Sequence, residues 1–224
     1  MKVIIFDSST IINLIMNGIE EVLVDLKKKF SGKFIITNQI KHEVIDRPLQ
    51  IKKFELGALK VQKLLDEKVL EMPESLGIKS DELKEKTHEL TNRINKIFEA
   101  KNEFIHLVDF GEASCLALSI LLAEKKIENM IAIDERTARM LGENPENLHK
   151  LFEKKLHTGV RIFRENLPKL DKLRFIRSSE LIYLAWKKNL VGLKNGNVLD
   201  ALLYATKFKG ASISSNEIEE IKRL

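Results

Sequence analysis

The sequence predicts an α/β fold: a three-layer α/β/α sandwich with a central parallel twisted sheet and extra helices. Short apolar runs at residues 2–6, 33–36 and 130–133 lack polar alternation, which is typical of parallel strands buried on both faces. Segments with helical periodicity separate these runs. Right-handed crossovers between parallel strands then place the strands' carboxyl ends, and the functional crevice, at one edge of the sheet.

The segments between and after the strands predict the helices. We expect a helical stretch from Thr10 to Phe30 that breaks near Gly18, and a helix that Thr37 or Asn38 caps and Pro48 ends. The remaining expected helices are 51–65, 80–100, 113–126, 135–141, 178–189 and 197–208, with extended pieces at 69–72, 160–163 and 211–213.

Length and composition favour one globular domain. The chain has 224 residues, of which 44% are hydrophobic and 32% charged, with no repeat or linker. We expect a single domain over 1–224, with a helical elaboration at about 50–101 and an extended C-terminal segment at about 143–224. No apolar run approaches the ~18 residues of a membrane span. We therefore expect no membrane partner. Cys115 is the only cysteine, so we expect no disulfide and a cytoplasmic location.

The charge balance is compatible with a nucleic-acid partner but does not require one. The net charge is +5 and the pI about 9.1. The lysine pairs are scattered over predicted helix ends and polar faces, so a solvated surface also explains them. Charge alone therefore leaves the class of partner open.

Four acidic residues follow the predicted strands or open the helices after them. Asp7 and Asp134 come directly after strands, and Glu43 and Glu112 lie in the first turns of helices. In a parallel sheet these junctions converge on one rim. Four crowded carboxylates have raised pKa values unless a hard divalent cation compensates them. The pattern therefore predicts a Mg²⁺ or Mn²⁺ site and metal-assisted phosphodiester hydrolysis.

Each acid also has an ordinary interpretation when it is taken alone. Asp7 or Asp134 after a strand is often a helix cap or a turn former. Glu43 alone is typical of a solvated helix residue, and Glu112 of a favourable charge at a helix N-terminus. Only their convergence favours chemistry, and that convergence depends on the predicted fold.

Four segments resemble, in order, the motifs of the PIN-domain superfamily. They are IIFDSSTIINL, ITNQIKHEVID, FGEASCLALSILLAE and IAIDERTARMLG. The residues that match the motifs are Asp7, Ser9, Asn13, Glu43, Gly111, Glu112, Asp134, Glu135, Arg136 and Arg139. The resemblance covers residues 1–142, and LDALLYATKFKGASIS is similar to the closing helix and strand of some members.

The resemblance implies a Mg²⁺- or Mn²⁺-dependent endoribonuclease that acts mainly on single-stranded RNA. It also implies a homodimer, and either a toxin with an antitoxin protein as partner or a factor in RNA processing. The chain departs from the family pattern in two ways. Glu112 replaces the commoner Asp, and the helix at 80–100 and the segment at 143–200 make it longer than the compact toxins.

Several neighbouring residues are candidates for supporting roles. Ser9 is expected to hydrogen-bond Asp7 or a metal-bound water, with a simple helix cap as the alternative. Asn13 is a candidate to orient Asp7, with a polar helix face as the alternative. Arg136 and Arg139 are candidate phosphate contacts or solvated helix residues. Asp109 is either an auxiliary ligand or a turn residue.

Two other functions compete with the nuclease. IIFDSST also resembles the opening of haloacid-dehalogenase-like phosphatases, whose chemistry needs Asp-x-Asp, but position 9 is Ser. The second alternative is a PIN-like scaffold that binds RNA or protein through a weak or inactive site. The complete set of four acids favours the enzyme over this scaffold.

Overall fold

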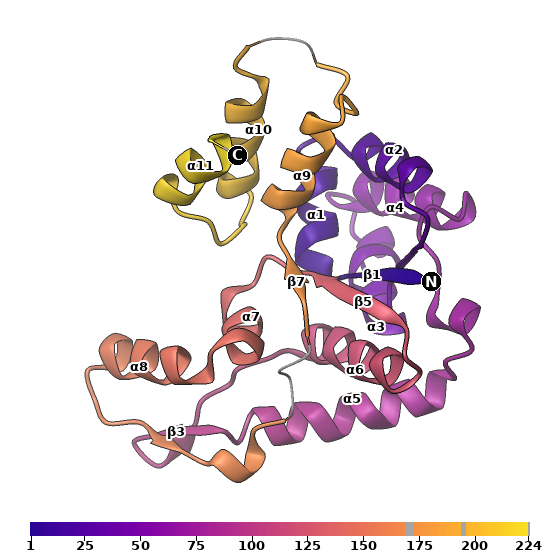
Figure 1. Cartoon of the computed structure of the whole chain (residues 1–224). Helices are drawn as coiled ribbons and strands as arrows, with labels where there is room; N and C mark the ends of the chain where they lie inside the picture. Colours follow the sequence, from indigo (N-terminus) through magenta and orange to yellow (C-terminus); the bar gives the residue numbers. More distant parts are fainter. Residues whose placement is uncertain (169–172, 194–195, 224) are drawn as a thin grey trace.

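A parallel four-stranded sheet forms the centre of the computed structural model, which describes residues 1–168, 173–193 and 196–223 (Figure 1). The strand order is β2-β1-β5-β7. The strands are β1 (Lys2–Phe6), β2 (Lys33–Ile35), β5 (Glu128–Ala132) and β7 (Phe175–Ile176). The first three confirm the predicted strands. Strand β7 was not predicted, because two residues are too few to show a pattern.

Helices lie on both faces of this sheet, as apolar parallel strands require (Figure 1). On one face α6 (Phe110–Glu124) packs against β1 and β5, and α5 (Ser80–Ile94) packs against α6. On the other lie α1 (Ser8–Met16), α4 (Glu55–Asp66) and α9 (Ser178–Lys187). The fold is therefore mixed α/β, with the parallel sheet in its interior.

The remaining helices connect these layers or extend the chain beyond them. They are α2 (Glu21–Lys29), α3 (Asn38–Lys41), η1 (His42–Asp46), η2 (Pro48–Gln50), η3 (Pro73–Leu76), α7 (Arg136–Glu143), α8 (Pro145–Leu156), η4 (Arg164–Asn166), α10 (Val198–Phe208) and α11 (Ser215–Lys222). The predicted break near Gly18 is confirmed, since Gly18 has φ +66° between α1 and α2. The predicted cap is also confirmed, because the Thr37 hydroxyl accepts a hydrogen bond from the Ile40 amide.

The helix predicted at 80–100 is too long by its last turn. α5 ends at Ile94, because the Asn95 side chain accepts the amides of Leu107 and Val108 and donates to the Val108 carbonyl. The chain then forms β3 (Phe98–Ala100), in a small antiparallel sheet with β4 (Glu103–Phe104) and β6 (Arg161–Ile162). The extended piece expected at 160–163 is this β6.

Other boundaries also differ from the prediction. The helix expected at 51–65 begins only at Glu55. The strand expected at 211–213 is absent from the structure, because Ala211 and Ile213 pack into a small apolar core between α9, α10 and α11 instead of pairing with a strand. Helices α8 and α11 were not predicted. Positions 169–172, 194–195 and 224 of the C-terminal segment lie outside the described residues.

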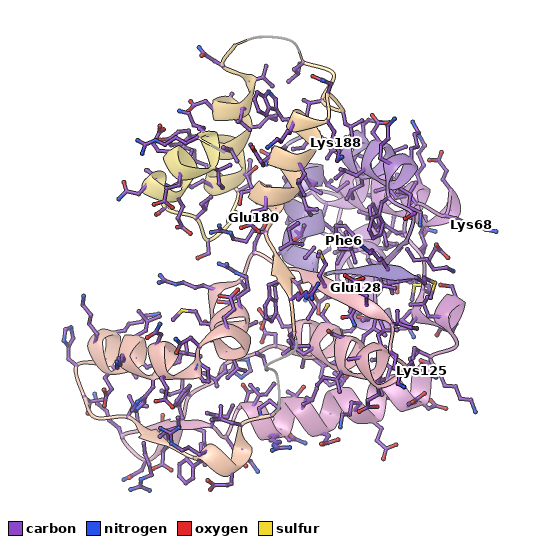
Figure 2. The ribbon with its side chains drawn as sticks, in the orientation of Figure 1. Phe6, Lys68, Lys125, Glu128, Glu180 and Lys188 are labelled. Atoms are coloured by element: carbon purple, nitrogen blue, oxygen red, sulfur yellow. The ribbon has the colours of Figure 1, made fainter. Side chains whose placement is uncertain are left out.

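Burial separates the interior from a strongly charged surface. Phe6 is fully buried and lies between the layers, whereas Lys68 and Lys125 project outward from the periphery (Figure 2). Cys115 is buried as expected. Within the described residues, no helix is long and apolar enough to cross a bilayer.

Candidate functional site

Asp7 ends β1 and caps α1 at the carboxyl edge of the sheet. Its Oδ2 accepts hydrogen bonds from the amide and the hydroxyl of Ser9, at 3.0 and 2.5 Å. Its side chain is buried, and Oδ1 has no hydrogen-bond partner among the described residues. Burial raises the pKa of Asp7 to about 6, which the Ser9 hydrogen bonds oppose and the charge of Glu43 reinforces. The site therefore holds an acceptor atom without a donor.

Glu43 reaches the same edge from a π-helical turn, η1, where the helix widens after α3. Its Oε1 accepts a hydrogen bond of 3.0 Å from the Gln39 side chain. The carboxylate lies against Gly111 of α6, where an added Cβ would be 2.6 and 2.8 Å from the two carboxylate oxygens. A side chain at position 111 would displace Glu43. The glycine of the third motif therefore lets α6 approach the acid.

Glu112 lies in the first turn of α6, next to this glycine. Its Oε2 accepts the backbone N–H of Asp109 at 2.9 Å, which is the return half of a capping box. Burial raises the pKa of Glu112 to about 8, and the charges of Asp7, Glu135 and Asp109 contribute in the same direction. The structure therefore brings Asp7, Glu43 and Glu112 within electrostatic reach of one another.

The thiol of Cys115 also indicates that Asp7, Glu43 and Glu112 lie close together. It is fully buried one turn after Glu112, and burial raises the pKa of its thiol well above the ordinary value. The charges of Asp7, Glu43 and Glu112 all raise it further. A single buried thiol thus lies close to three acids that come from three different segments of the chain.

Asp134 lies beside the site of Asp7, but its carboxylate bonds Ser178 at the start of α9. Its amide donates to the Ser9 hydroxyl at 3.1 Å, so Ser9 joins the ends of β1 and β5. Its Oδ1 accepts the amide and hydroxyl of Ser178 at 2.9 Å each, and thereby caps α9. Burial raises the pKa of Asp134, while Ser178 and the charges of Arg139 and Arg177 lower it. Its Oδ2 is buried without a hydrogen-bond partner among the described residues.

The four carboxylates are not arranged as a ready ligand shell. In the part of the chain that the structure describes, no group of three or more His, Cys, Asp or Glu side chains is placed to hold a metal ion. Glu43 and Glu112 each bond a donor in their own segment, and Asp134 bonds Ser178 across the chain. The donor atoms that fit a cation are the unpartnered Oδ1 of Asp7 and the unpartnered Oδ2 of Asp134.

Of the residues predicted to support the four acids, Ser9 belongs to this site, and the others lie at the surface or hold the fold together. Ser9 bonds Asp7 as expected. Among the described residues, Asn13 forms no hydrogen bond with Asp7. It is buried and donates to the Thr206 carbonyl at 2.9 Å, so it holds α1 against α10. Arg136 is exposed at the start of α7. Asp109 is exposed and faces His106.

Arg139 lines a cavity of about 270 Å³ together with Glu143, Phe175, Arg177, Glu180 and Glu217. The charges of Arg139 and Arg177 also act on Asp134. The guanidinium of Arg177 pairs with Glu180 at 2.9 Å and with Glu217 at 2.5 Å. The Nε of Arg139 is buried without a partner among the described residues. Figure 2 shows Glu180 at the start of α9, beside the carboxyl end of β7. Two arginines face three glutamates here, so the lining is not cationic.

Arg177 and the contact between Ser178 and Asp134 were not predicted from the sequence. A signal was present, because Arg177-Ser-Ser follows β7 just as Asp7-Ser-Ser follows β1. Both are strand-to-helix junctions with two serines. Without β7, the second junction could not be recognised as one.

If the acids bind Mn²⁺, as the sequence pattern predicts, replacing Gly111 with alanine is expected to weaken that binding about tenfold, because the new methyl group displaces the Glu43 carboxylate. Isothermal titration calorimetry measures the affinity. Gly57→Ala in α4 is the matched control, since its Cβ meets only Ile15, at 3.3 Å. Both changes favour the helical state. Unchanged affinity in Gly111→Ala would separate Glu43 from metal binding.

Comparisons of this chain with models of known protein families, with curated proteins and with solved structures found no match. The case for a function therefore rests on the residues and geometry of the site.

Proposed function

We propose that this chain is a divalent-metal-dependent endoribonuclease of PIN type that hydrolyses single-stranded RNA at the site of Asp7, Glu43, Glu112 and Asp134. The observation that carries the proposal is the crowding of Asp7, Glu43 and Glu112 around a buried point, with Asp7 Oδ1 left without a donor. No lysine or arginine of the described residues forms an ion pair with any of these three acids. A cation from outside the chain is the natural compensation.

Each residue would have its own role at such a site. Asp7, Glu43, Glu112 and Asp134 would hold Mg²⁺ or Mn²⁺, which when bound neutralises charge on a phosphodiester and makes water a better nucleophile. Ser9 fixes Asp7 Oδ2 and so directs Oδ1 into the site. Gly111 leaves the space that Glu43 occupies. Under this proposal the α/β/α layering of the PIN fold is the framework that brings the four junctions together.

Removal and return of the metal test the proposal. Incubated with a labelled single-stranded RNA and Mn²⁺, the chain is expected to cut it. Excess EDTA should abolish the products, and added Mn²⁺ should restore them, because the acids then regain their cation. Gel electrophoresis of the RNA is the measurement. A double-stranded RNA of the same sequence is the control and should remain largely intact. Cleavage that persists in EDTA would contradict a metal-dependent site.

A binding scaffold is the second candidate, and one observation favours it. The carboxylates of Glu43, Glu112 and Asp134 already bond donors of the chain, so metal binding requires them to turn. The scaffold predicts RNA binding without cleavage at any Mn²⁺ concentration and no calorimetric signal for Mn²⁺. The nuclease predicts both a metal-binding signal and cleavage. The two measurements together separate these functions.

A further inference from the structure

A second cavity, of about 170 Å³, lies between α3, α5 and α6. Its lining includes Asn38 and Gln39 at the start of α3, Leu83 and Lys84 on α5, and Phe110 at the start of α6, and serine and threonine side chains complete it. The helix that the sequence analysis predicted at 80–100 without a function thus forms one side of it. The volume is well below the roughly 300–1,000 Å³ of pockets for drug-sized ligands, so the cavity suits one small flat group.

This cavity adjoins the acids. Gln39 lines it and also hydrogen-bonds the Glu43 carboxylate at 3.0 Å. Phe110 lines it and directly precedes Gly111, whose backbone lies against the same carboxylate. A group held in the cavity is therefore next to Glu43, close enough for the remainder of its chain to cross the acidic site.

The lining combines an aromatic ring, an apolar wall and free amide acceptors. The Phe110 ring lies 4.7 Å from the His88 ring, centroid to centroid, which holds it at the cavity. The side-chain amides of Asn38 and Gln39 donate to Ser80 and Glu43, but within the described residues their carbonyl oxygens accept nothing. A heterocycle with exocyclic amino groups matches this set, because its face can stack and its edge can donate.

Lys84 adds a free cation at the rim of the cavity. Two residues further along α5, Lys86 pairs with Glu89 at 2.9 Å. Among the described residues, Lys84 forms no ion pair or hydrogen bond. An unpaired ammonium that lines the cavity is suited to a phosphate of the same ligand. The ligand therefore combines a flat base with a phosphate.

We propose that this cavity binds one base of single-stranded RNA, stacked on Phe110 beside the phosphodiester that the acids cut. The inference rests on the proposed function for the identity of the neighbouring site, but base binding itself does not require cleavage. It gives α5 a function: to hold the base and, through Lys84, a phosphate next to it.

A double-mutant cycle tests the stacked base. The probe is a fluorescein-labelled six-nucleotide oligoadenylate, with an abasic nucleotide placed at each position in turn, titrated in EDTA with fluorescence anisotropy. Phe110→Ala is expected to weaken binding of the intact probe about tenfold, because one stacking contact is lost. One abasic position should weaken binding to the unmodified protein by a similar factor. The same position should have almost no effect on Phe110→Ala.

Further variants control for folding and for the loss of an exposed aromatic ring elsewhere. Phe110→Trp should keep the affinity, since it keeps a stacking face, and Asn38→Ala on the exposed start of α3 should weaken binding severalfold. Phe104→Ala removes an exposed aromatic that packs on Phe163 outside the cavity, and should have no effect. Circular dichroism checks that each variant is folded.

The outcomes distinguish this inference from the proposed function. If no abasic position couples to Phe110, or if the protein binds no RNA, the base site is wrong, whether or not Mn²⁺-dependent cleavage occurs. If one position couples and no cleavage is found with Mn²⁺, the base site stands and the nuclease does not. Coupling at one position together with cleavage supports both.

Discussion

Asp7→Asn is expected to lower the rate of Mn²⁺-dependent RNA cleavage at least about a hundredfold, a change of roughly 3 kcal/mol or more in the activation free energy. The reason is local. Asp7 is buried, its Oδ2 is fixed by Ser9, and Oδ1 is the donor atom that the chain leaves without a partner. Asparagine keeps the size of the side chain and removes the charge that a hard cation requires. Single-turnover cleavage of a labelled RNA measures the rate.

The matched control for Asp7→Asn is Asp46→Asn. Asp46 ends the same π-helical turn that carries Glu43, but its carboxylate faces Lys41 at 2.5 Å and is partly exposed. Its loss should leave the cleavage rate within about twofold of the original, because surface ion pairs contribute little. If Asp7→Asn cleaved RNA as fast as the unchanged protein, the activity would belong to another site or to a contaminant.

The metal-free protein is expected to become less stable as the pH rises. The pKa of Asp7 is raised from 3.8 to about 6 and that of Glu112 from 4.5 to about 8, so the folded state binds more protons than the unfolded chain. The destabilisation is absent below the unfolded pKa values. It grows between pH 3.8 and about 6 for Asp7, and between 4.5 and about 8 for Glu112. Asp7 alone accounts for roughly 3 kcal/mol.

Glu112→Gln is expected to stabilise the metal-free protein at pH 8, on the order of 2 kcal/mol, since glutamine carries no charge to bury and can still accept the Asp109 amide. Urea unfolding in EDTA at several pH values measures the free energy of unfolding. Saturating Mn²⁺ should stabilise the unchanged protein more than the variant. Glu89→Gln, a half-exposed acid on α5, is the control. A Glu112→Gln protein that is less stable at pH 8, with the original pH dependence, would show that Glu112 is not strained by burial.

Removing the charge of one of these acids is expected to have opposite effects on stability and on activity. Removing a carboxylate should stabilise the empty protein and abolish the activity. A purely structural role for Glu112, as the return half of the capping box, predicts instead that Glu112→Gln, which can keep the bond to the Asp109 amide, leaves the stability and the cleavage rate nearly unchanged. Stability and cleavage measured on the same variants therefore distinguish a functional cluster from helix capping.

The sequence by itself determined the three longer strands and the acids at their ends. Asp7 and Asp134 could be placed because the apolar runs before them are encoded in consecutive residues. Glu43 and Glu112 could be placed because each lies within two turns of the start of a predicted helix. The break at Gly18 and the cap at Thr37 followed from the same local chemistry. Such features depend on a few neighbouring residues, so the sequence pattern is sufficient.

Only the tertiary structure decided which donors each acid meets. Asp134 caps α9 through Ser178, 44 positions further along, and Asn13 holds Thr206 across 193 positions instead of orienting Asp7. The two-residue strand β7 and the end of α5 at Asn95 likewise depend on partners distant in the chain. Pairings of this kind arise when separate elements pack against one another. No local pattern encodes them, because each residue alone is compatible with many partners.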